Sequence, residues 1–289
     1  MTQRETRSKS TPKRDSTKGS KRPLNRNSER PPKLPGNQLW LYGVHAVLAA
    51  LANKDRKIRR LLLTPEAQRS HAPAIMQARS KRPLPGEEIT ERAEMDRLLP
   101  ANAVHQGIAV LAEHLDGIGI EDVGRMAEGH DHAVIMVLDQ VTDPHNVGAI
   151  LRSAAAFGAL AVVVTDRHSP EETGALAKSA SGALEVMPLI RVTNMVRALE
   201  QLKEAGFWTA GMAGEATQTI AQAKLSGKIA LVMGAEGEGL RRLTREHCDH
   251  LVKLPMSRLV ESLNVSNAAA IALYELAREQ DLASAPASH

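Results

Sequence analysis

From residue 133 onward, short apolar runs alternate with segments that have helical periodicity. The apolar runs predict strands at 133–138, 160–165, 185–189, 207–212, 229–233 and 250–254. Helices are predicted near 146–157, 172–180, 193–205 and 266–279. Apolar strands separated by helices indicate a parallel sheet that is covered on both faces. The pattern therefore predicts an α/β fold.

Ligands of such sheets bind beyond the carboxyl ends of the strands. The loops expected at those ends carry most of the polar motifs and cover 139–146, 212–218, 234–240 and 255–265. A binding site is therefore predicted where these loops meet.

A second, smaller α/β domain is predicted over residues 37–112, where helices and strands also alternate. Its expected elements are an amphipathic helix at 40–51 opened by Gly43, a strand at 58–63, helices at 67–79 and 94–98, and a strand at 108–112. Residues 113–132 are rich in glycine and acidic side chains, which predicts a linker with room for one short helical turn. The larger domain then spans 133–280, and 281–289 form a flexible end.

The charge of the chain is unevenly distributed. Residues 1–36 hold eleven Lys and Arg against three acidic residues, whereas the whole chain has a net charge of only +4. This segment lacks the apolar content that would offset the entropy of ordering, so a disordered basic tail is predicted. Two interpretations stay open at this point, a solvated tail without a specific role and a loose phosphate-binding arm.

Composition narrows the class of protein further. The single cysteine, Cys248, excludes disulfide frameworks and cysteine metal sites, and no metal is expected. His45 and His105 have no acidic or cysteine partners at metal-ligand spacing, so structural roles are favoured for both. No apolar run approaches the roughly 18 residues of a membrane helix, and no signal peptide is visible. A soluble cytoplasmic protein is expected.

The first polar motif follows the strand at 133–138 and contains Asn146, Gly148 and Arg152. Between Pro144 and Thr165, Arg152 is the only residue with a certain formal charge. So apolar a helix is expected to be buried, and a buried arginine needs a partner or a task. The alternative is that Asn146 only caps the helix and Arg152 pairs with a structural carboxylate.

The second motif, LVMGAEGEGL at 231–240, places Glu236 in a glycine-rich turn. Its spacing is not that of a dinucleotide-binding loop, and its two carboxylates would repel a phosphate. A cationic ligand or an arginine suits it better, so Glu236 is predicted to pair with Arg152. A solvated acidic turn is the alternative.

The third motif crowds Ser262, Asn264, Ser266 and Asn267 at the start of an alanine-rich helix. Helix starts carry free N–H groups and the positive end of the dipole, which suit an anion or a polar ligand edge. Four candidates are more than one cap requires. The excess favours a binding site.

Together the three motifs resemble those of the knotted, SPOUT-class RNA ribose 2′-O-methyltransferases of the TrmH type. Asn-x-Gly-x-x-x-Arg matches Asn146 to Arg152, Gly-x-Glu-Gly-x-Gly matches Gly234 to Gly239, and Ser-Leu-Asn-Val-Ser matches Ser262 to Ser266. Tyr42 to Ala46 and His105 to Gly107 are similar to the ribosomal-protein-like RNA-binding domain of the RlmB subgroup. The resemblance covers about residues 39–279, with a departure at Arg258, where glycine is common.

The resemblance implies a fold, a cofactor and an assembly. The expected fold is a parallel-sheet domain with a trefoil knot, preceded by the small RNA-binding domain. S-adenosylmethionine would lie against Gly234, Leu254 and Leu263, and the family works as a homodimer through the C-terminal domain. The resemblance also implies the catalytic residues, which are Arg152, Asn146, Glu236, Ser262 and Asn264.

The implied reaction is methyl transfer to a ribose 2′-OH of RNA, most simply a guanosine of large-subunit (23S) ribosomal RNA. Arginine is unsuited to act as a general base because it stays protonated in proteins. An electrostatic role is therefore preferred for Arg152. Transfer RNA is the alternative substrate. A non-catalytic RNA-binding protein and a Rossmann-like oxidoreductase are the alternative classes, and the missing GxGxxG argues against the latter.

Overall fold

The computed structural model describes residues 34–257 and 259–284, which belong to one compact unit. Most of the predicted basic tail, position 258 and the final residues 285–289 lie outside this part of the chain. Within the described residues, no helix has the length and apolar character that crossing a membrane requires.

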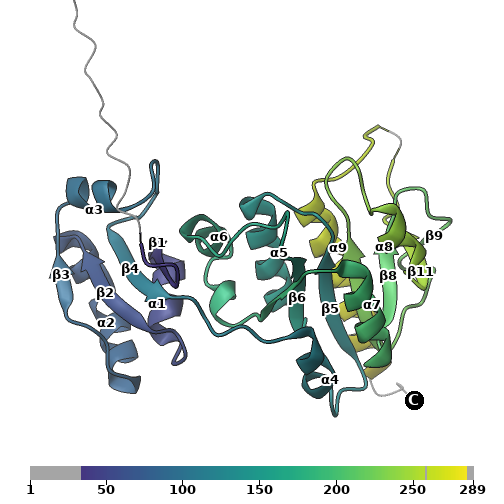
Figure 1. The fold of residues 1–289 in the computed structure, drawn as a ribbon, viewed down its shortest axis with the longest axis horizontal. Coiled ribbons are helices and arrows are strands. Elements are labelled where there is room, and N and C mark those ends of the chain that lie inside the picture. Colours follow the sequence, from purple (N-terminus) through teal and green to yellow (C-terminus); the bar gives the residue numbers. More distant parts are fainter. Residues whose placement is uncertain (1–33, 258, 285–289) are drawn as a thin grey trace, which may run out of the picture. The chain divides into compact units, whose positions relative to one another are not determined.

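The C-terminal domain is built on a seven-stranded, all-parallel sheet (Figure 1). Its strands lie in the order β7 (Leu189–Val192), β6 (Ala161–Thr165), β5 (Ala133–Leu138), β10 (Lys228–Met233), β8 (Trp208–Met212), β11 (His250–Lys253) and β9 (Gln218–Thr219). Every neighbouring pair is parallel. The predicted parallel sheet is confirmed.

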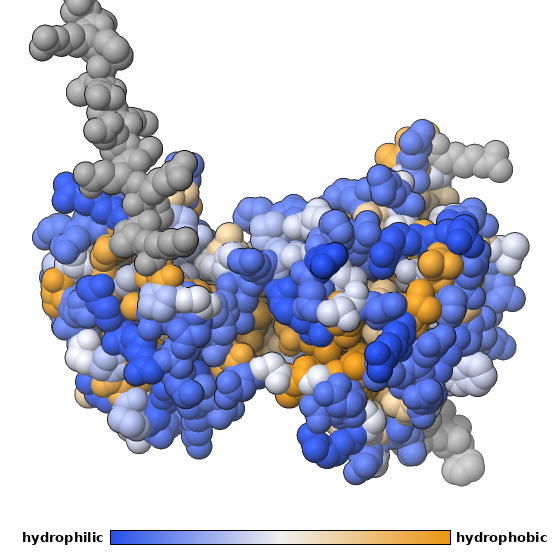
Figure 2. Space-filling model, in the orientation of Figure 1, coloured by the Kyte–Doolittle hydropathy of each residue, from blue (hydrophilic) through white to orange (hydrophobic). Residues whose placement is uncertain are grey.

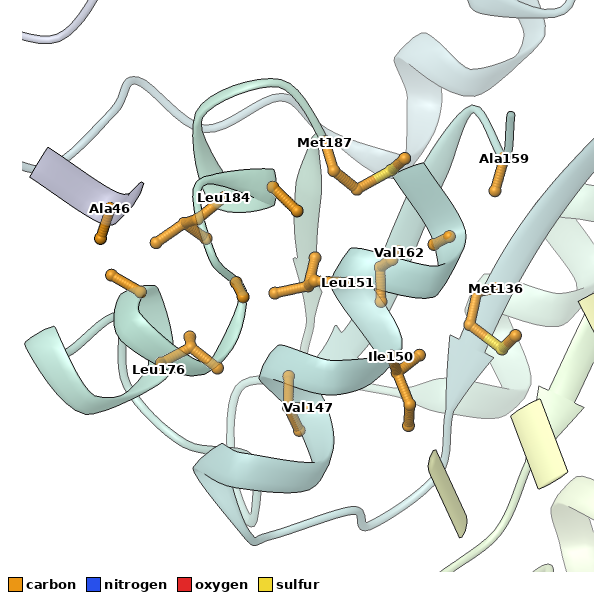
Figure 3. Close-up of a cluster of buried hydrophobic side chains, with 14 of the residues drawn as sticks. Ala46, Met136, Val147, Ile150, Leu151, Ala159, Val162, Leu176, Leu184 and Met187 are labelled. Atoms are coloured by element: carbon orange, nitrogen blue, oxygen red, sulfur yellow. The ribbon is translucent and has the colours of Figure 1, made fainter. Parts of the chain in front are cut away.

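Helices cover both faces of this sheet, as the apolar strands predict. Successive side chains of β5 point to opposite faces, so Met136 packs in one hydrophobic cluster and Ile135 in another. The Met136 cluster contains residues of α5 (Pro144–Ala156), α6 (Gly174–Ser179) and α9 (Val265–Ser284). The Ile135 cluster contains residues of α4 (Val123–Met126) and α7 (Met195–Glu204). Figure 3 shows Ile150 and Leu151 of α5 among the side chains of the first cluster.

The N-terminal domain has a mixed four-stranded sheet in the order β1 (Gln38–Tyr42), β4 (Ile108–Glu113), β2 (Ile58–Leu63) and β3 (Glu87–Ile89). Residues of α1 (Val44–Ala52) and α2 (Pro65–Lys81) pack with one face of this sheet. Met95 of α3 (Arg92–Leu98) packs with Trp40, Tyr42 and Leu62 on the other face. The predicted linker contains the short helices η1 (Ile120–Asp122) and α4.

Several predicted elements need correction. The expected helix at 40–51 is instead the end of β1 followed by α1, and Gly43 makes the turn between them with a φ of 87°. The expected strand at 185–189 is wrong. Residues 183–185 form the 3-10 helix η2, and β7 starts only at Leu189, after Pro188, which cannot donate a ladder hydrogen bond.

The remaining differences concern short or terminal elements. Three elements were not predicted, namely β3, β9 and α8 (Arg242–Glu246). Helix α9 runs to Ser284 and so extends into the segment expected to be a flexible end. The trefoil knot stays a prediction.

Candidate active site

The polar loops meet at the carboxyl ends of β8, β10 and β11, around a cavity of about 930 Å³. Gly234, Leu254 and Leu263, which are the residues expected to line the cofactor, all contribute to its wall. Glu236 and Ser262 line it as well. The cavity is within the size range of small-molecule sites in proteins.

The glycine-rich motif forms a tight loop that returns to the end of β10. Ala235 and Gly239 exchange two backbone hydrogen bonds of 3.0 and 2.9 Å. A Cβ atom on Gly234 would lie 2.1 Å from the carbonyl carbon of Gly239, so no side chain fits there. Gly237 and Gly239 have φ values of 84° and 71°, which glycine adopts at least cost. The glycines therefore shape one wall of the cavity with backbone alone.

Asn146 does not cap α5. The N-cap is Asp143, whose carboxylate accepts a hydrogen bond of 2.9 Å from the backbone of His145, with Pro144 in the first helical turn. Gly148 has a packing role, because a Cβ atom there would lie 2.5 Å from Cβ of Ser179 in α6. Asn146 is therefore free to bond elsewhere.

A directional hydrogen-bond network connects the three motifs. Asn264 Oδ1 accepts from the backbone N–H of Ser266 at 2.9 Å and from its hydroxyl at 2.5 Å. The amide nitrogen of Asn264 donates to Asn146 Oδ1 at 3.0 Å. Asn146 in turn donates to Glu236 Oε2 at 3.3 Å. Three of the residues implied by the resemblance, Asn146, Glu236 and Asn264, therefore form one hydrogen-bonded chain, and their catalytic roles stay predictions.

Arg152 departs from the prediction. The expected burial is wrong, because its side chain is exposed. No hydrogen bond or ion pair joins it to another residue in 34–257 or 259–284, so the expected pair with Glu236 is also absent from this chain. Arg152 lies six residues after Asn146 and thus about 120° around the helix from it. The face of α5 that packs on the sheet is formed by Val147, Ile150, Leu151 and Ala154.

Ser262 and the loop before it are exposed. Ser262 lines the cavity, but among the described residues nothing forms a hydrogen bond with its hydroxyl. Met256, Leu259 and Val260 expose 42, 92 and 54% of their surfaces. In Figure 2, apolar groups are visible on the largely hydrophilic surface of this domain. The single chain leaves this side of the site open.

An ion pair between the exposed Arg241 and the buried Asp139, which the sequence analysis did not predict, anchors the glycine-rich loop. Asp139 directly follows β5 and has no exposed surface. Its carboxylate accepts from Nε of Arg241 at 2.8 Å and from the guanidinium nitrogen Nη2 at 2.6 Å. The sequence did carry a signal for this ion pair, namely a carboxylate at the end of an apolar strand. A carboxylate that is buried there must be paired.

The wall of the cavity suits a cationic ligand. Glu215, Glu236, Glu238 and Glu261 line it, against the cations Arg245 and Lys253. Arg245 is already paired with Glu215. The remaining carboxylates would favour a positive group such as a sulfonium, and the glycine-rich backbone leaves room for a ligand to approach. The residues present therefore fit S-adenosylmethionine.

Family comparisons agree with this geometry. Residues 133–274 match the SpoU rRNA methylase family, and residues 40–116 match the substrate-binding domain of RNA 2′-O ribose methyltransferases. The chain belongs to the SpoU family of RNA methylases.

Two relatives are similar to this chain over nearly their whole length. The chain is 40% identical over 242 residues to the 23S rRNA (guanosine-2′-O-)-methyltransferase RlmB of Photobacterium profundum, covering 84% of this chain and 98% of the relative. It is 42% identical over 243 residues to the RlmB of Pseudomonas putida, covering 84 and 97%.

Solved structures support the fold. The SpoU methyltransferase AviRb of Streptomyces viridochromogenes, in complex with AdoMet, superposes with a TM-score of 0.70 at 23% identity, over 85% of this chain and 91% of that one. An AdoMet-bound rRNA methyltransferase of Sinorhizobium meliloti has a TM-score of 0.68 at 20% identity, over 84 and 87%.

Proposed function

We propose that this protein transfers a methyl group from S-adenosylmethionine to the ribose 2′-OH of a guanosine in 23S ribosomal RNA. The observation that carries the proposal is the network of Asn264, Asn146 and Glu236 beside a cavity lined by carboxylates and glycine backbone. Relatives at about 40% identity over nearly their whole length bear that activity in their names. This substrate would place the protein in the cytoplasm.

The cofactor would be held by Gly234, Leu254 and Leu263, largely through backbone atoms of the cavity wall. When bound, the cofactor would supply a methyl group that is attached to a sulfonium sulfur. Loss of this methyl group would convert the sulfonium into a neutral thioether. Glu236 adds negative charge on the same wall and is held in place by Asn146. The chain then needs a group that stabilises the developing negative charge on the ribose oxygen.

Arg152 is the proposed group. An arginine guanidinium stays protonated and so cannot serve as a base, but it can stabilise an alkoxide or an adjacent phosphate. We expect Arg152→Ala to abolish methyl transfer while the affinity for the cofactor, measured by calorimetry, stays close to that of the wild type. Equal loss of both would show that Arg152 binds the cofactor instead.

The exposed position of Arg152 favours a site completed by a second copy of the chain. Helix α5 packs against α9, and the α9 residues Ile271 and Tyr274 expose 46 and 54% of their surfaces. Exposed apolar groups of this kind are typical of surfaces that bind a partner. We therefore propose a homodimer through the C-terminal domain, in which Arg152 of one subunit serves the site of the other.

Mixing two inactive variants tests this arrangement. Arg152→Ala and Asn146→Asp are purified separately, mixed, and allowed to exchange subunits. If Arg152 acts across the dimer, one site of each heterodimer is intact, and roughly a quarter of the wild-type rate returns because heterodimers make up about half of a statistical mixture. No recovery despite proven exchange would place Arg152 in the site of its own chain.

The reaction itself is tested with tritiated S-adenosylmethionine and RNA that lacks the modification. Digestion to nucleosides should yield labelled 2′-O-methylguanosine from 23S rRNA and none from transfer RNA. Label in transfer RNA alone would favour the alternative substrate. RNA binding without transfer of the tritiated methyl group would show that the protein is a non-catalytic RNA-binding module.

The N-terminal domain would contribute to RNA binding, as its family match suggests. Residues 1–36 would add a phosphate-binding arm. Their net charge predicts that the affinity for RNA falls as the salt concentration rises, because Lys and Arg side chains that bind phosphates release counterions from the RNA. Removing residues 1–33 should flatten that dependence without changing the cofactor affinity.

A further inference from the structure

Arg56 is a fully buried arginine for which the sequence analysis predicted no role. It lies between α1 and β2 of the N-terminal domain and has no exposed surface. Nε and Nη2 donate to the Glu185 carboxylate, with Nη2 at 2.8 Å from Oε1. Nη1 donates to Glu172 Oε1 and to the carbonyl of Glu113, both at 2.8 Å. Glu172 and Glu185 belong to the C-terminal domain, so this guanidinium joins the two domains.

The guanidinium of Arg56 stays charged although it is buried. Burial disfavours the charged guanidinium, but the hydrogen bonds and negative charges of Glu185 and Glu172 outweigh it, so the pKa of Arg56 is raised. The Glu185 side chain is only 3% exposed. Only arginine offers a planar fork that can satisfy both carboxylates and a carbonyl at once.

Other contacts surround this ion cluster. Asn53 Nδ2 donates to Glu185 Oε2 at 2.9 Å, and His114 Nδ1 lies 3.3 Å from Glu172 Oε2. Ala46 of α1 belongs to the same buried cluster as Leu176 and Leu184 of the C-terminal domain (Figure 3). Domain interfaces that lack a sizeable apolar contact are usually mobile, but this one combines a shared core with buried charges.

The same C-terminal segment also supports the start of α5. Ser179 Oγ donates to the carbonyl of His145 at 2.9 Å, next to Asn146. Gly148 lies so close to Ser179 that a Cβ atom would not fit. Lys178, the neighbouring residue, donates to the carbonyl of Val104 in the N-terminal domain at 2.7 Å. One segment, residues 172–185, therefore contacts both the N-terminal domain and the first motif of the site.

We propose that residues 172–185 hold the N-terminal domain at a fixed position relative to the methyl-transfer site, and that Arg56 is the positioning residue of this junction. RNA bound to the N-terminal domain is thereby presented to the site at one distance. The inference rests on the proposed function for its kinetic part only, because the fixed position can be measured without RNA.

The spectroscopic test uses the full chain with spin labels on introduced cysteines, Met76→Cys in α2 and Glu204→Cys in α7. Burial raises the pKa of the Cys248 thiol to about 12, so the one native cysteine should react with the label much more slowly than the two introduced ones. The wild-type background should give one narrow distance distribution, and Arg56→Gln should broaden it. Arg125→Gln is the matched control, because that arginine forms an exposed ion pair with Asp122.

The kinetic test compares the same variants on unmodified 23S rRNA. Arg56→Gln should raise KM for the rRNA about tenfold or more, because a loosely tethered module has a lower effective concentration. The kcat at saturating RNA and the cofactor affinity should stay unchanged. A merely stabilising residue would instead lower the active fraction, and with it kcat, at constant KM.

Two results would overturn the inference. One is a narrow distance distribution in Arg56→Gln, and the other is a broadened distribution with wild-type KM. If Arg56→Gln does not fold, Arg56→Met combined with Glu185→Met removes both buried charges and is judged by the same criteria. A wild-type protein that transfers no methyl group would refute the proposed function, while the distances would still test the junction.

Discussion

The sharpest prediction concerns the direction of the hydrogen bonds through Asn146. Its carbonyl accepts from Asn264 at 3.0 Å, and its amide nitrogen donates to Glu236 at 3.3 Å. Asn264 cannot reverse this order, because its own oxygen is occupied by the N–H and hydroxyl of Ser266. Asn146→Asp keeps the size of the side chain and the bond from Asn264, but it places an oxygen opposite Glu236.

The structure allows the cost of each variant to be estimated. Asn146→Ala loses two hydrogen bonds, and about 1 kcal/mol for each gives about 2 kcal/mol, or about 30-fold in rate. Asn146→Asp loses only the bond to Glu236, about 1 kcal/mol, but adds a repulsion of about 1–2 kcal/mol between carboxylates near an exposed surface. The isosteric variant should therefore be at least as damaging as alanine.

The assay is kcat/KM for methyl transfer, with thermal unfolding as a check on the fold. Asn264→Asp is the companion variant, since aspartate caps α9 as well as asparagine but cannot donate to Asn146. It should melt near the wild-type temperature and transfer methyl groups as poorly as Asn146→Asp. An Asn146→Asp enzyme that clearly exceeds Asn146→Ala would refute the directional network.

Two further predictions concern the cavity wall and a separate ion pair between Asp249 and Lys203. Gly234→Ala should weaken cofactor binding in calorimetry, because its Cβ would collide with the Gly239 backbone, whereas Gly86→Ala, which meets nothing within 4 Å, should not. Partial burial opposes ionisation of Asp249, but hydrogen bonds from Lys203 and Thr209 outweigh it and hold the pKa of this carboxyl below its usual value. Asp249→Asn should therefore destabilise the protein by about 1–3 kcal/mol in urea at neutral pH, and the difference should vanish as the pH falls through the folded-state pKa. Unchanged cofactor affinity in the first case, or a pH-independent difference in the second, would contradict these assignments.

The sequence was informative where apolar runs fix the geometry. The ends of strands β5, β8, β10 and β11 were predicted to within one residue. Parallel strands bring their carboxyl ends to one edge of the sheet. The loops that hold Asn146, Glu236 and Asn264 could therefore be expected to meet. Which side chain bonds to which could not, because that depends on loop conformations that no periodicity describes.

The error at Arg152 has a physical cause. Helix α5 was judged apolar all round because alanines fill much of its surface, but alanine is tolerated on an exposed face as readily as in a core. The alternative that Asn146 only caps the helix could have been set aside from the sequence, because Asp143 followed by Pro144 is the usual signature of a helix start.

Arg56 illustrates a different limit. It lies in the charged run NKDRKIRR, which is typical of a solvated loop, and its partner Glu185 is 129 residues away. Nothing local distinguishes it from Arg59, whose side chain is 56% exposed. Buried ion pairs between domains are determined by tertiary contacts, so they become visible only in a structure.

The proposed activity is tested most directly by mapping 2′-O-methyl groups along 23S rRNA from cells that lack this protein, with and without the wild-type gene restored. The proposal predicts one guanosine that loses its ribose methyl group in the deletion and regains it on complementation, but not with Arg152→Ala. An unchanged methylation map of 23S rRNA in the deletion would contradict it.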